Sequence, residues 1–326
     1  MYILTKVILA IIIGFITSVV IGLFIVPILK KMKIRQNIST FMQFSHKNKN
    51  GTPTMGGLIF ILSTLVTTIA LLITKKIEFT HVLKLVMFVF FSYAFIGFLD
   101  DFLSIKKGKN EGLTVIQKLL LQVLVAMIFF YLYISEGGST ALYISTLNIY
   151  IEMKWFYGVF MLFVLVGASN AVNLTDGLDG LAGGLSAIAF FAFSLISLTV
   201  GYTDMGIFTL ILTGSLIGFL VFNANPAKVF MGDTGSLSLG AVMAAVAIIT
   251  HRELTLLIVA FVFVIETLSD ILQIFWYKTF KKRIFLMAPL HHHFEKLGWN
   301  EVDIVRMFWV FGFILAAAGI VFGVWI

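Results

Sequence analysis

Three aspartates of this sequence have a spacing and a local sequence that would allow them to bind a metal ion or exchange protons with a substrate. Asp100 and Asp101 are adjacent, and Asp233 lies in the segment Gly-Asp-Thr-Gly-Ser, residues 232–236, directly before an apolar run. Mg²⁺ prefers one or two carboxylates together with substrate phosphates. A helix that begins at this segment would also offer backbone N–H groups and the Ser236 hydroxyl to a phosphate. The pattern predicts phosphate chemistry; the alternatives are that the aspartate pair ends a solvated helix and that Asp233 is only an N-cap.

A second polar group lies in the segment Asn-Leu-Thr-Asp-Gly-Leu-Asp-Gly, residues 173–180. Asn173, Asp176 and Asp179 are spaced by three residues, so their side chains would line one face if the segment were helical. The surrounding glycines favour a turn or a broken helix and allow the backbone to approach a ligand closely. We expect a polar substrate site here; the alternative is a polar loop with turn glycines.

Three consecutive histidines, His291, His292 and His293, form a further polar group. Consecutive side chains diverge on any regular backbone, so this spacing fits a three-histidine zinc site poorly. Hydrogen bonds from these side chains to phosphate or sugar oxygens are the better interpretation.

Two carboxylates and an amide, Glu266, Asp270 and Gln273, fall within an apolar run. Carboxylates inside a membrane segment are functional candidates by default. For Glu266 the alternative is a hydrogen bond between helices. Asp270 and Gln273 lie nearer the end of the run and could reach the same site as the other polar groups.

The composition indicates that membrane helices position these residues. Of the 326 residues, 60% are hydrophobic and only 12% are charged, and the mean hydropathy is +1.05. Soluble domains carry about 25% charged residues, so a water-soluble or disordered chain is excluded. A spanning helix needs about 20 apolar residues. Ten apolar runs of suitable length occur, at about 7–29, 55–74, 81–99, 114–134, 155–172, 180–200, 205–222, 235–250, 254–277 and 303–326.

These runs are continuous and lack the period-2 alternation of a membrane β-barrel. We therefore expect an all-α, polytopic integral membrane protein with about ten transmembrane helices, forming a single transmembrane domain over residues 1–326. The first run is too long for the core of a signal peptide and is expected to be retained. The chain has no cysteine, which excludes disulfides, thiolate metal sites and a cysteine nucleophile.

Lysine and arginine are distributed unevenly over the connections between the runs. The connections after odd-numbered runs hold fifteen of them, and those after even-numbered runs hold four. Because cytoplasmic loops carry the excess of positive charge, we expect the odd connections in the cytoplasm and both termini outside. The polar groups also fall on the odd connections or on the run ends beside them. The sequence therefore predicts one composite site at the cytoplasmic face of the membrane, where the positive charge would also attract anionic lipids or an anionic substrate.

Five motifs taken together resemble one enzyme family. They are Gly-Thr-Pro-Thr-Met-Gly-Gly at 51–57, Phe-Leu-Asp-Asp at 98–101, Asn-Leu-Thr-Asp-Gly-Leu-Asp-Gly at 173–180, Met-Gly-Asp-Thr-Gly-Ser at 231–236 and Ala-Pro-Leu-His-His-His-Phe-Glu at 288–295. In this order they resemble the phospho-N-acetylmuramoyl-pentapeptide transferases, of the polyprenyl-phosphate N-acetylhexosamine-phosphate transferase superfamily. The family's ten-span fold with external termini agrees with the count from apolar runs.

The resemblance implies a reaction. The phosphate of undecaprenyl phosphate would attack the sugar-linked phosphate of UDP-N-acetylmuramoyl-pentapeptide, UMP would leave, and lipid I of peptidoglycan synthesis would form. The implied cofactor is Mg²⁺ and the implied location is the cytoplasmic (inner) membrane of a bacterial cell, in contact with membrane lipids. A homodimer is compatible with the resemblance, and no nucleic-acid partner is expected. Phosphoryl transfer needs charge neutralisation and in-line positioning, which metal ions, Lys, His and N–H donors supply.

The resemblance also implies roles for individual residues. Asp233 matches the family's magnesium ligand, and Asp100 and Asp101 match paired carboxylates that hold the metal or, for one of them, deprotonate the lipid phosphate. Leu178 and Phe230 are the candidates to pack against uracil. The expected substrate-binding residues are Lys49, Thr52, Lys118, Asn173, Asp176, Leu178, Asp179, Asn223, Phe230, Gly232, Ser236, Gln273, His291, His292 and His293.

Two other functions compete with this interpretation. A sister enzyme would transfer N-acetylglucosamine phosphate from UDP-N-acetylglucosamine to a polyprenyl phosphate; it would share the aspartates but lack the histidine motif. A cation-coupled transporter would use Glu266 and Asp270. Transporters usually show internal repeats and polar breaks at the membrane midplane, whereas the polar residues of this chain gather at one face.

Overall fold

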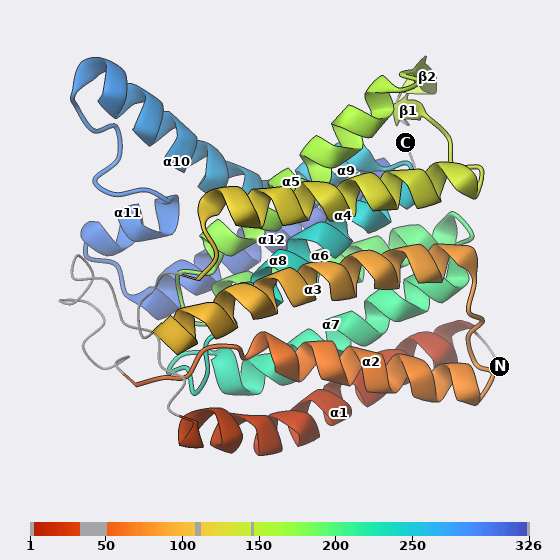
Figure 1. Cartoon of the computed structure of the whole chain (residues 1–326), viewed down its shortest axis with the longest axis horizontal. Coiled ribbons are helices and arrows are strands. Elements are labelled where there is room, and N and C mark those ends of the chain that lie inside the picture. Colours follow the sequence, from red (N-terminus) through yellow and green to blue (C-terminus); the bar gives the residue numbers. More distant parts are fainter. Residues whose placement is uncertain (1–2, 33–50, 108–111, 145–146, 325–326) are drawn as a thin grey trace.

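The computed structural model describes residues 3–32, 51–107, 112–144 and 147–324, and it is a bundle of α-helices with one short β-hairpin (Figure 1). The elements are α1 (Ile3–Lys31), α2 (Gly57–Ile73), α3 (His81–Lys107), α4 (Val115–Ser135), β1 (Ala141–Ile144), β2 (Ile149–Glu152), α5 (Phe156–Thr175), α6 (Leu181–Thr199), α7 (Thr203–Asn223), α8 (Gly232–Ile249), α9 (Glu253–Val259), α10 (Phe261–Phe280), α11 (Leu290–Lys296) and α12 (Glu301–Val324). Each apolar run of the sequence forms a helix, except that the ninth run is divided between α9 and α10.

The surface of the bundle is suited to lipid. Among the described residues, eight helices are long and apolar enough to cross a membrane, or nine if α9 and α10 form one bent span. Large apolar side chains point outward, such as Phe24 and Phe163, which are 68% and 75% exposed. An apolar outer surface of this kind is covered by hydrocarbon in a membrane protein. The chain is therefore a predominantly α-helical, multi-pass membrane protein.

Two of the apolar runs differ from simple spans. α2 has 17 residues, which is short for a span. α9 and α10 meet at Ala260 with a bend of 82°, so the ninth run is not the single straight helix that its continuous apolar character predicts. After this bend α10 extends away from the rest of the bundle (Figure 1).

The innermost helix is α8, which packs against α3 and α5 and is buried from Thr234 to Ile249. Of its apolar window 89% is buried, compared with 17% for α4 at the periphery. A close approach at Gly97 brings α3 against the start of α8, because a Cβ at Gly97 would lie 2.1 Å from the carbonyl oxygen of Asp233. This contact brings the aspartate pair of α3 beside Asp233.

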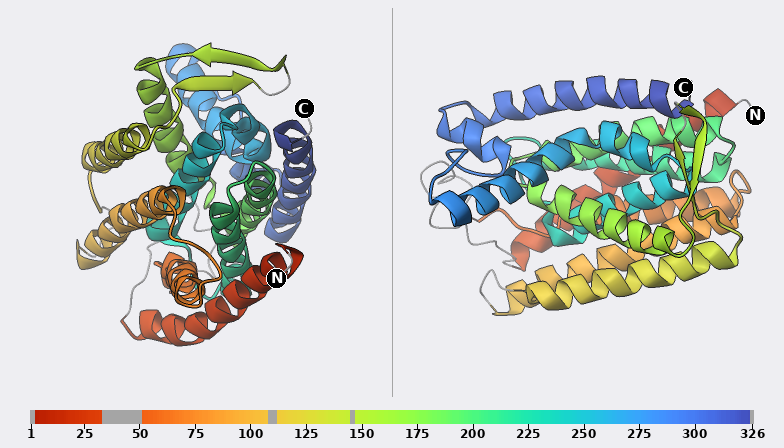
Figure 2. Two further views of the ribbon diagram at one scale, coloured as in Figure 1. Left: turned by 90° about the vertical axis from the view of Figure 1, so that its right-hand side faces the viewer. Right: turned by 90° about the horizontal axis from the view of Figure 1, so that it is seen from above.

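The bundle has two chemically different ends. Figures 1 and 2 show that α3, α5 and α7 end, and α4, α6, α8 and α12 begin, at the same end of the bundle, which we call the polar end. The start of α1, the end of α12 and the β-hairpin lie together at the opposite end. All the polar motifs with described residues lie at or next to the polar end.

The β-hairpin between α4 and α5 is a feature that the sequence analysis did not predict. Its strands have four residues each and pair antiparallel, with Ala141 opposite Glu152. Tyr143 and Tyr150 stack across the strands at 4.4 Å between ring centroids, and the Arg252 guanidinium lies over the Tyr143 ring. Strands this short give no periodic signal that can be distinguished from a loop.

Candidate active site

Asp101, close to the end of α3, holds the start of α8. Its carboxylate accepts hydrogen bonds from the backbone N–H of Asp233 at 3.2 Å, the N–H of Thr234 at 3.0 Å and the Thr234 hydroxyl at 2.6 Å. A negative charge is favourable there because it satisfies free N–H groups and complements the helix dipole. The residue that caps α8 is therefore Asp101, and the alternative that Asp233 acts as a mere N-cap is wrong.

Lys118 lies between two carboxylates. Its Nζ is 3.3 Å from Oδ1 of Asp100 and 2.5 Å from Oδ2 of Asp233. Lys118 stands in the first turn of α4, which begins with a capping box on Thr114. Asp100 also accepts the N–H of Leu113 at 2.9 Å, so it joins α3 to the segment before α4. The two neighbouring aspartates thus point to different partners, Asp100 to α4 and Asp101 to α8.

Asn173, in the last turn of α5, contacts Asp233 from the other side. Its Nδ2 donates to Oδ1 of Asp233 at 2.8 Å and lies 2.8 Å from the hydroxyl oxygen of Ser236. The Ser236 hydroxyl in turn donates to the carbonyl oxygen of Gly232 at 3.1 Å. Each carboxylate oxygen of Asp233 therefore has a donor from a different helix, Lys118 from α4 and Asn173 from α5.

Asp176 adds a further carboxylate beside the start of α8, where it accepts the backbone N–H of Gly232. Loss of hydration on burial, followed by the negative charges of Asp233 and Asp101, raises the pKa of Asp176 to about 7. Four carboxylates thus surround this helix start, and Lys118 is the cation that the described contacts place among them. The local charge is negative.

This charge balance fits a divalent cation. Among the described residues, no group of three His, Asp or Glu side chains is already arranged as a metal site. Mg²⁺ takes only one or two carboxylates and completes its coordination with waters and substrate phosphates, so such a group is not required. Asp100 and Asp233 are the aspartates of the cluster that face Lys118 and keep part of their surface exposed, with 13% and 22% of their side chains accessible. They are the residues that would hold the ion.

Asp179 lies elsewhere than the sequence analysis predicts. The helix α5 ends before it and the chain turns through residues 177–180, so Asp179 does not share a helical face with Asn173. Its Oδ2 accepts the backbone N–H of Ala227 at 3.0 Å and the side-chain amide of Asn225 at 3.2 Å. Asp179 thus fastens the loop that follows α7, and the prediction of a common face is wrong for this residue.

Other predicted substrate-binding residues hold the loop after α7 or lie in the hydrophobic core. Asn223 is 2% exposed and donates to the carbonyl oxygen of Val229 at 3.0 Å. Leu178 is 3% exposed within the hydrophobic core, so the surface expected to pack against uracil is covered. Phe230 is half-buried, and its backbone pairs with that of Pro53 and Gly56. Phe230 remains the better candidate of the two for contact with a base.

The motif at residues 51–57 is fixed against the segment before α8. The N–H groups of Phe230, Gly56 and Gly57 donate to the carbonyl oxygens of Pro53, Phe230 and Met231 at 2.8–2.9 Å. Thr52 is half-buried at the start of this pairing. Lys49, the remaining predicted residue of this region, lies outside the described residues.

The three histidines point to three different partners, as their spacing predicts. His291 Nδ1 is 2.8 Å from Glu266, His292 Nδ1 is 2.6 Å from Glu295, and His293 Nδ1 accepts a backbone N–H at 3.1 Å. The histidines therefore do not form one binding surface. Glu266 makes a contact between helices, in agreement with the alternative considered for it.

Gln273 of α10 holds the segment that leads to the histidines. Its Oε1 accepts the backbone N–H groups of Ile284 and Phe285 at 3.1 and 3.0 Å, and its Nε2 donates to the carbonyl oxygen of Phe285 at 3.1 Å. A cavity of about 320 Å³ lies beside it and is lined in part by Asp270 and Arg283. Gln273 therefore lies next to a polar cavity, but its amide is occupied by the backbone.

Sequence reasoning missed two residues that support the site. The Thr234 hydroxyl bonds to Asp101, and it lies in the 231–236 motif, which could have pointed to it. Glu301 accepts the N–H of Asp179 at 2.8 Å and lies 3.2 Å from the Asn225 amide. It begins α12, beyond all the motifs, and no local signal in the sequence distinguishes it.

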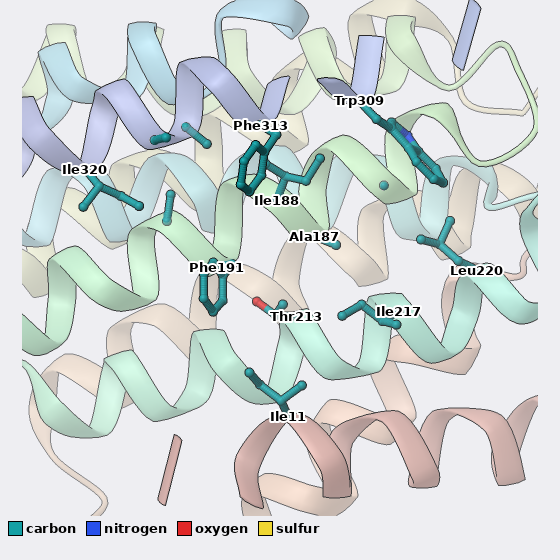
Figure 3. Close-up of a pocket in the computed structure, with 14 residues that line it drawn as sticks. Ile11, Ala187, Ile188, Phe191, Thr213, Ile217, Leu220, Trp309, Phe313 and Ile320 are labelled. Atoms are coloured by element: carbon teal, nitrogen blue, oxygen red, sulfur yellow. The ribbon is translucent and has the colours of Figure 1, made fainter. Parts of the chain in front are cut away.

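A second cavity, of about 460 Å³, lies between α1, α6, α7 and α12. Figure 3 shows Phe191, Phe313 and Trp309 around it, with Thr213 as a polar side chain in the lining. The lining holds no charged group, so this cavity suits hydrocarbon and not phosphate. The Asp100, Lys118 and Asp233 cluster lies at the polar end and does not line this cavity.

Known proteins resemble this chain over nearly its whole length. The model of glycosyl transferase family 4 matches residues 82–251, which include Asp100, Lys118 and Asp233, and phospho-N-acetylmuramoyl-pentapeptide-transferase signature 1 matches residues 49–61. The chain is 48% identical to the phospho-N-acetylmuramoyl-pentapeptide-transferase of Bacillus cytotoxicus over 96% of each chain. It is 47% identical to the protein of that name from a Geobacillus strain over 98% of each chain. The chain belongs to the phospho-N-acetylmuramoyl-pentapeptide transferase family of enzymes.

Proposed function

We propose that this chain transfers phospho-N-acetylmuramoyl-pentapeptide from UDP-N-acetylmuramoyl-pentapeptide to undecaprenyl phosphate. An oxygen of the lipid phosphate forms a bond to the sugar-linked phosphorus, and the bond from that phosphorus to UMP breaks. The products are UMP and lipid I, a membrane intermediate of peptidoglycan synthesis. The observation that carries the proposal is the meeting of Asp100, Lys118 and Asp233 at one end of a membrane bundle. Such a place is open to both a water-soluble nucleotide and a long lipid.

In this proposal each residue of the cluster has a separate task. Lys118 contacts the diphosphate and balances its charge. Asp233 and Asp100 would hold Mg²⁺, which would supply neutralisation of the negative charge of the phosphates. Asn173 keeps the Asp233 carboxylate in its orientation through the 2.8 Å hydrogen bond. Asp101 fixes the start of α8 and so presents Asp233 to the substrates.

The contacts of the aspartate pair favour Asp100 for any proton transfer. Asp101 is 8% exposed and its carboxylate is occupied by donors of α8. Asp100 faces Lys118 and retains accessible surface. A base is a modest requirement, because a phosphate is already largely ionised near pH 7. Asp100 would therefore take the remaining proton of the lipid phosphate.

The assay that tests the reaction measures UMP release by purified protein with undecaprenyl phosphate, Mg²⁺ and one UDP-sugar at a time. We expect release with UDP-N-acetylmuramoyl-pentapeptide and none with UDP-N-acetylglucosamine. Release with UDP-N-acetylglucosamine alone would assign the chain to the sister reaction instead. No release with either substrate would refute the proposal.

We further propose that the polar end faces the cytoplasm and that the chain lies in the bacterial cytoplasmic membrane, with both termini outside. Support comes from the described Lys and Arg residues of the connections. At the polar end they are Lys30, Lys31, Lys106, Lys107, Lys228, Lys278, Lys281, Lys282, Arg283 and Lys296, and at the opposite end Lys75, Lys76, Lys154 and Arg252. This asymmetry follows the rule that cytoplasmic loops are enriched in positive charge. A homodimer stays a prediction.

Because the chain has no cysteine, single-cysteine labelling tests this orientation cleanly. Lys228 and Lys154 are both exposed and lie at opposite ends of the bundle. We expect a membrane-impermeant maleimide to label Lys228→Cys only in inside-out vesicles and Lys154→Cys only in intact cells stripped of their wall. The reverse pattern would overturn the orientation.

A further inference from the structure

Glu266, inside α10, and His291, in the first turn of α11, form a completely buried pair. Oε2 of Glu266 is 2.8 Å from Nδ1 of His291, and the backbone N–H of His291 donates to Oε1 at 3.1 Å. Both side chains have 0% exposure. A buried carboxylate is costly unless it is paired and hydrogen-bonded, so the two residues are held together as one unit.

This pairing fixes the orientation of the imidazole. A carboxylate accepts hydrogen bonds, so Nδ1 carries the proton that lies between the two side chains. The other ring nitrogen, Nε2, is buried and has no hydrogen-bond partner among the described residues. It faces Gly177, because a Cβ at that glycine would lie 2.3 Å from Nε2. Only a glycine leaves room for the ring there.

Gly177 connects this pair to the candidate active site. Asp176, its neighbour, accepts the N–H of Gly232 at the start of α8, next to Asp233. We propose that Glu266 is a positioning residue that acts through His291: the oriented ring lies against the 176–177 turn and keeps Asp176 against the start of α8. This inference rests on the proposed function, because the geometry that it maintains is that of the Asp233 cluster.

Removing the carboxylate should affect turnover more than substrate binding. In Glu266→Gln the side-chain volume is kept, but an amide donor must face one of the two N–H groups of His291, so the ring loses its fixed orientation. Displacement of catalytic groups by about 1 Å can reduce rates about 100-fold. We expect kcat to fall about 10- to 100-fold while KM for the UDP-sugar stays within about threefold.

The chain offers a matched control in Glu253, a second buried glutamate in the same bent segment. It bonds to Tyr157 at the opposite end of the bundle and is 3% exposed. Glu253→Gln should leave kcat unchanged. In a His291→Gln background, Glu266→Gln should cause no additional loss of kcat. The effects of substituting two residues that act through one contact do not add. Gly177→Ala, which pushes against the ring, should reproduce the fall in kcat.

A measurement independent of activity separates this inference from the proposed function. The ¹⁵N NMR spectrum of histidine-labelled protein reports which ring nitrogen carries the proton, and the His291 signals are assigned from their loss in His291→Gln. We expect these signals to show protonated Nδ1 and to shift in Glu266→Gln but not in Glu253→Gln. Absence of UMP release by the unmodified protein would refute the proposed function, while the NMR result would still test the pairing.

Other outcomes would overturn the inference directly. These are an unchanged kcat in Glu266→Gln, a loss confined to KM, a loss that adds fully to that of His291→Gln, or an equal loss of kcat in Glu253→Gln. Unchanged His291 signals in Glu266→Gln would also overturn it.

Discussion

The two ends of the bundle both contain acidic side chains, but these side chains differ in exposure and in the charge of their partners. At the polar end, Asp100 and Asp233 share Lys118 and keep 13% and 22% of their side chains exposed. At the opposite end, Glu253 is 3% exposed and accepts a hydrogen bond from the Tyr157 hydroxyl. The first group has more negative than positive charge and is accessible, whereas the second is a single acid enclosed with a neutral partner.

In the proposed function, this difference separates a reactive site from a structural contact within one membrane fold. An enclosed acid with a neutral hydrogen-bond donor contributes to stability and has no access to substrates. A group of carboxylates with surplus charge at an accessible helix end suits a further cation, and perturbed groups of this kind cluster at functional sites. The residue types are similar, so the charge balance and the exposure decide between the two roles.

Removal of divalent metal should have the largest effect, and only at the polar end. With excess EDTA we expect UMP release to fall below detection, because the phosphate charge and the surplus carboxylates are then not neutralised. Added Mg²⁺ should restore the rate. The hydrogen bond between Tyr157 and Glu253 involves no metal, so this end of the bundle should be unaffected. Undiminished release in EDTA would remove the argument for a metal at this site.

Asp233→Asn should have the next largest effect. The variant keeps the size of the side chain but loses a charge that faces Lys118, so kcat should drop about 10²- to 10³-fold, as for loss of one preorganised electrostatic group. The protein should still fold in the membrane, which detergent extraction and size-exclusion chromatography would check. A rate within twofold of the unmodified enzyme would contradict the role of Asp233.

Asp101→Asn should affect both activity and stability, but each moderately. The amide of Asn points a donor at the N–H groups that start α8, so the cap is weakened by about 1–2 kcal/mol, and kcat should fall because Asp233 moves with the helix start. Thermal unfolding and UMP release together measure the two effects. Asp303→Asn on the exposed face of α12 is the control, and an identical result for both variants would refute the cap.

Glu253→Gln should have the smallest effect on activity and act on stability alone. Glutamine can still accept the Tyr157 hydroxyl through its carbonyl oxygen, but the acceptor is then a neutral amide, so the weaker contact should cost about 1 kcal/mol of stability. Thermal unfolding in detergent measures this loss. A fall in kcat as large as that of Asp101→Asn would erase the distinction between the two ends.

Much of the architecture could be predicted from local sequence because membrane helices depend on local hydropathy. Each apolar run except the ninth coincides with one helix, and the polar motifs assemble at one end of the bundle. The bend at Ala260 was not predictable, since α9 and α10 form a continuous apolar segment without a proline or glycine at the break. At the break the two halves take different partners: α9 packs mainly against α12, and α10 packs mainly against α5.

The individual tasks of site residues were less predictable than their identity. Asp100 and Asp101 have nearly the same local sequence, yet adjacent residues of a helix point about 100° apart, which directs one to Lys118 and the other to Thr234. The Asp101–Thr234 bond spans 133 residues and the Glu266–His291 pair spans 25. Contacts over such separations depend on the tertiary fold, and no local pattern encodes them.

The central claim is that the nucleotide binds at the polar end of the bundle. The most direct test of this claim locates the bound nucleotide. Hydrogen–deuterium exchange of the purified protein with and without UMP and Mg²⁺ compares both ends in one experiment. The account predicts slower exchange at the turn after α5, residues 176–180, and at the start of α8, residues 232–236, and no change in the hairpin at 141–152. Protection of the hairpin with no change at the start of α8 would contradict it.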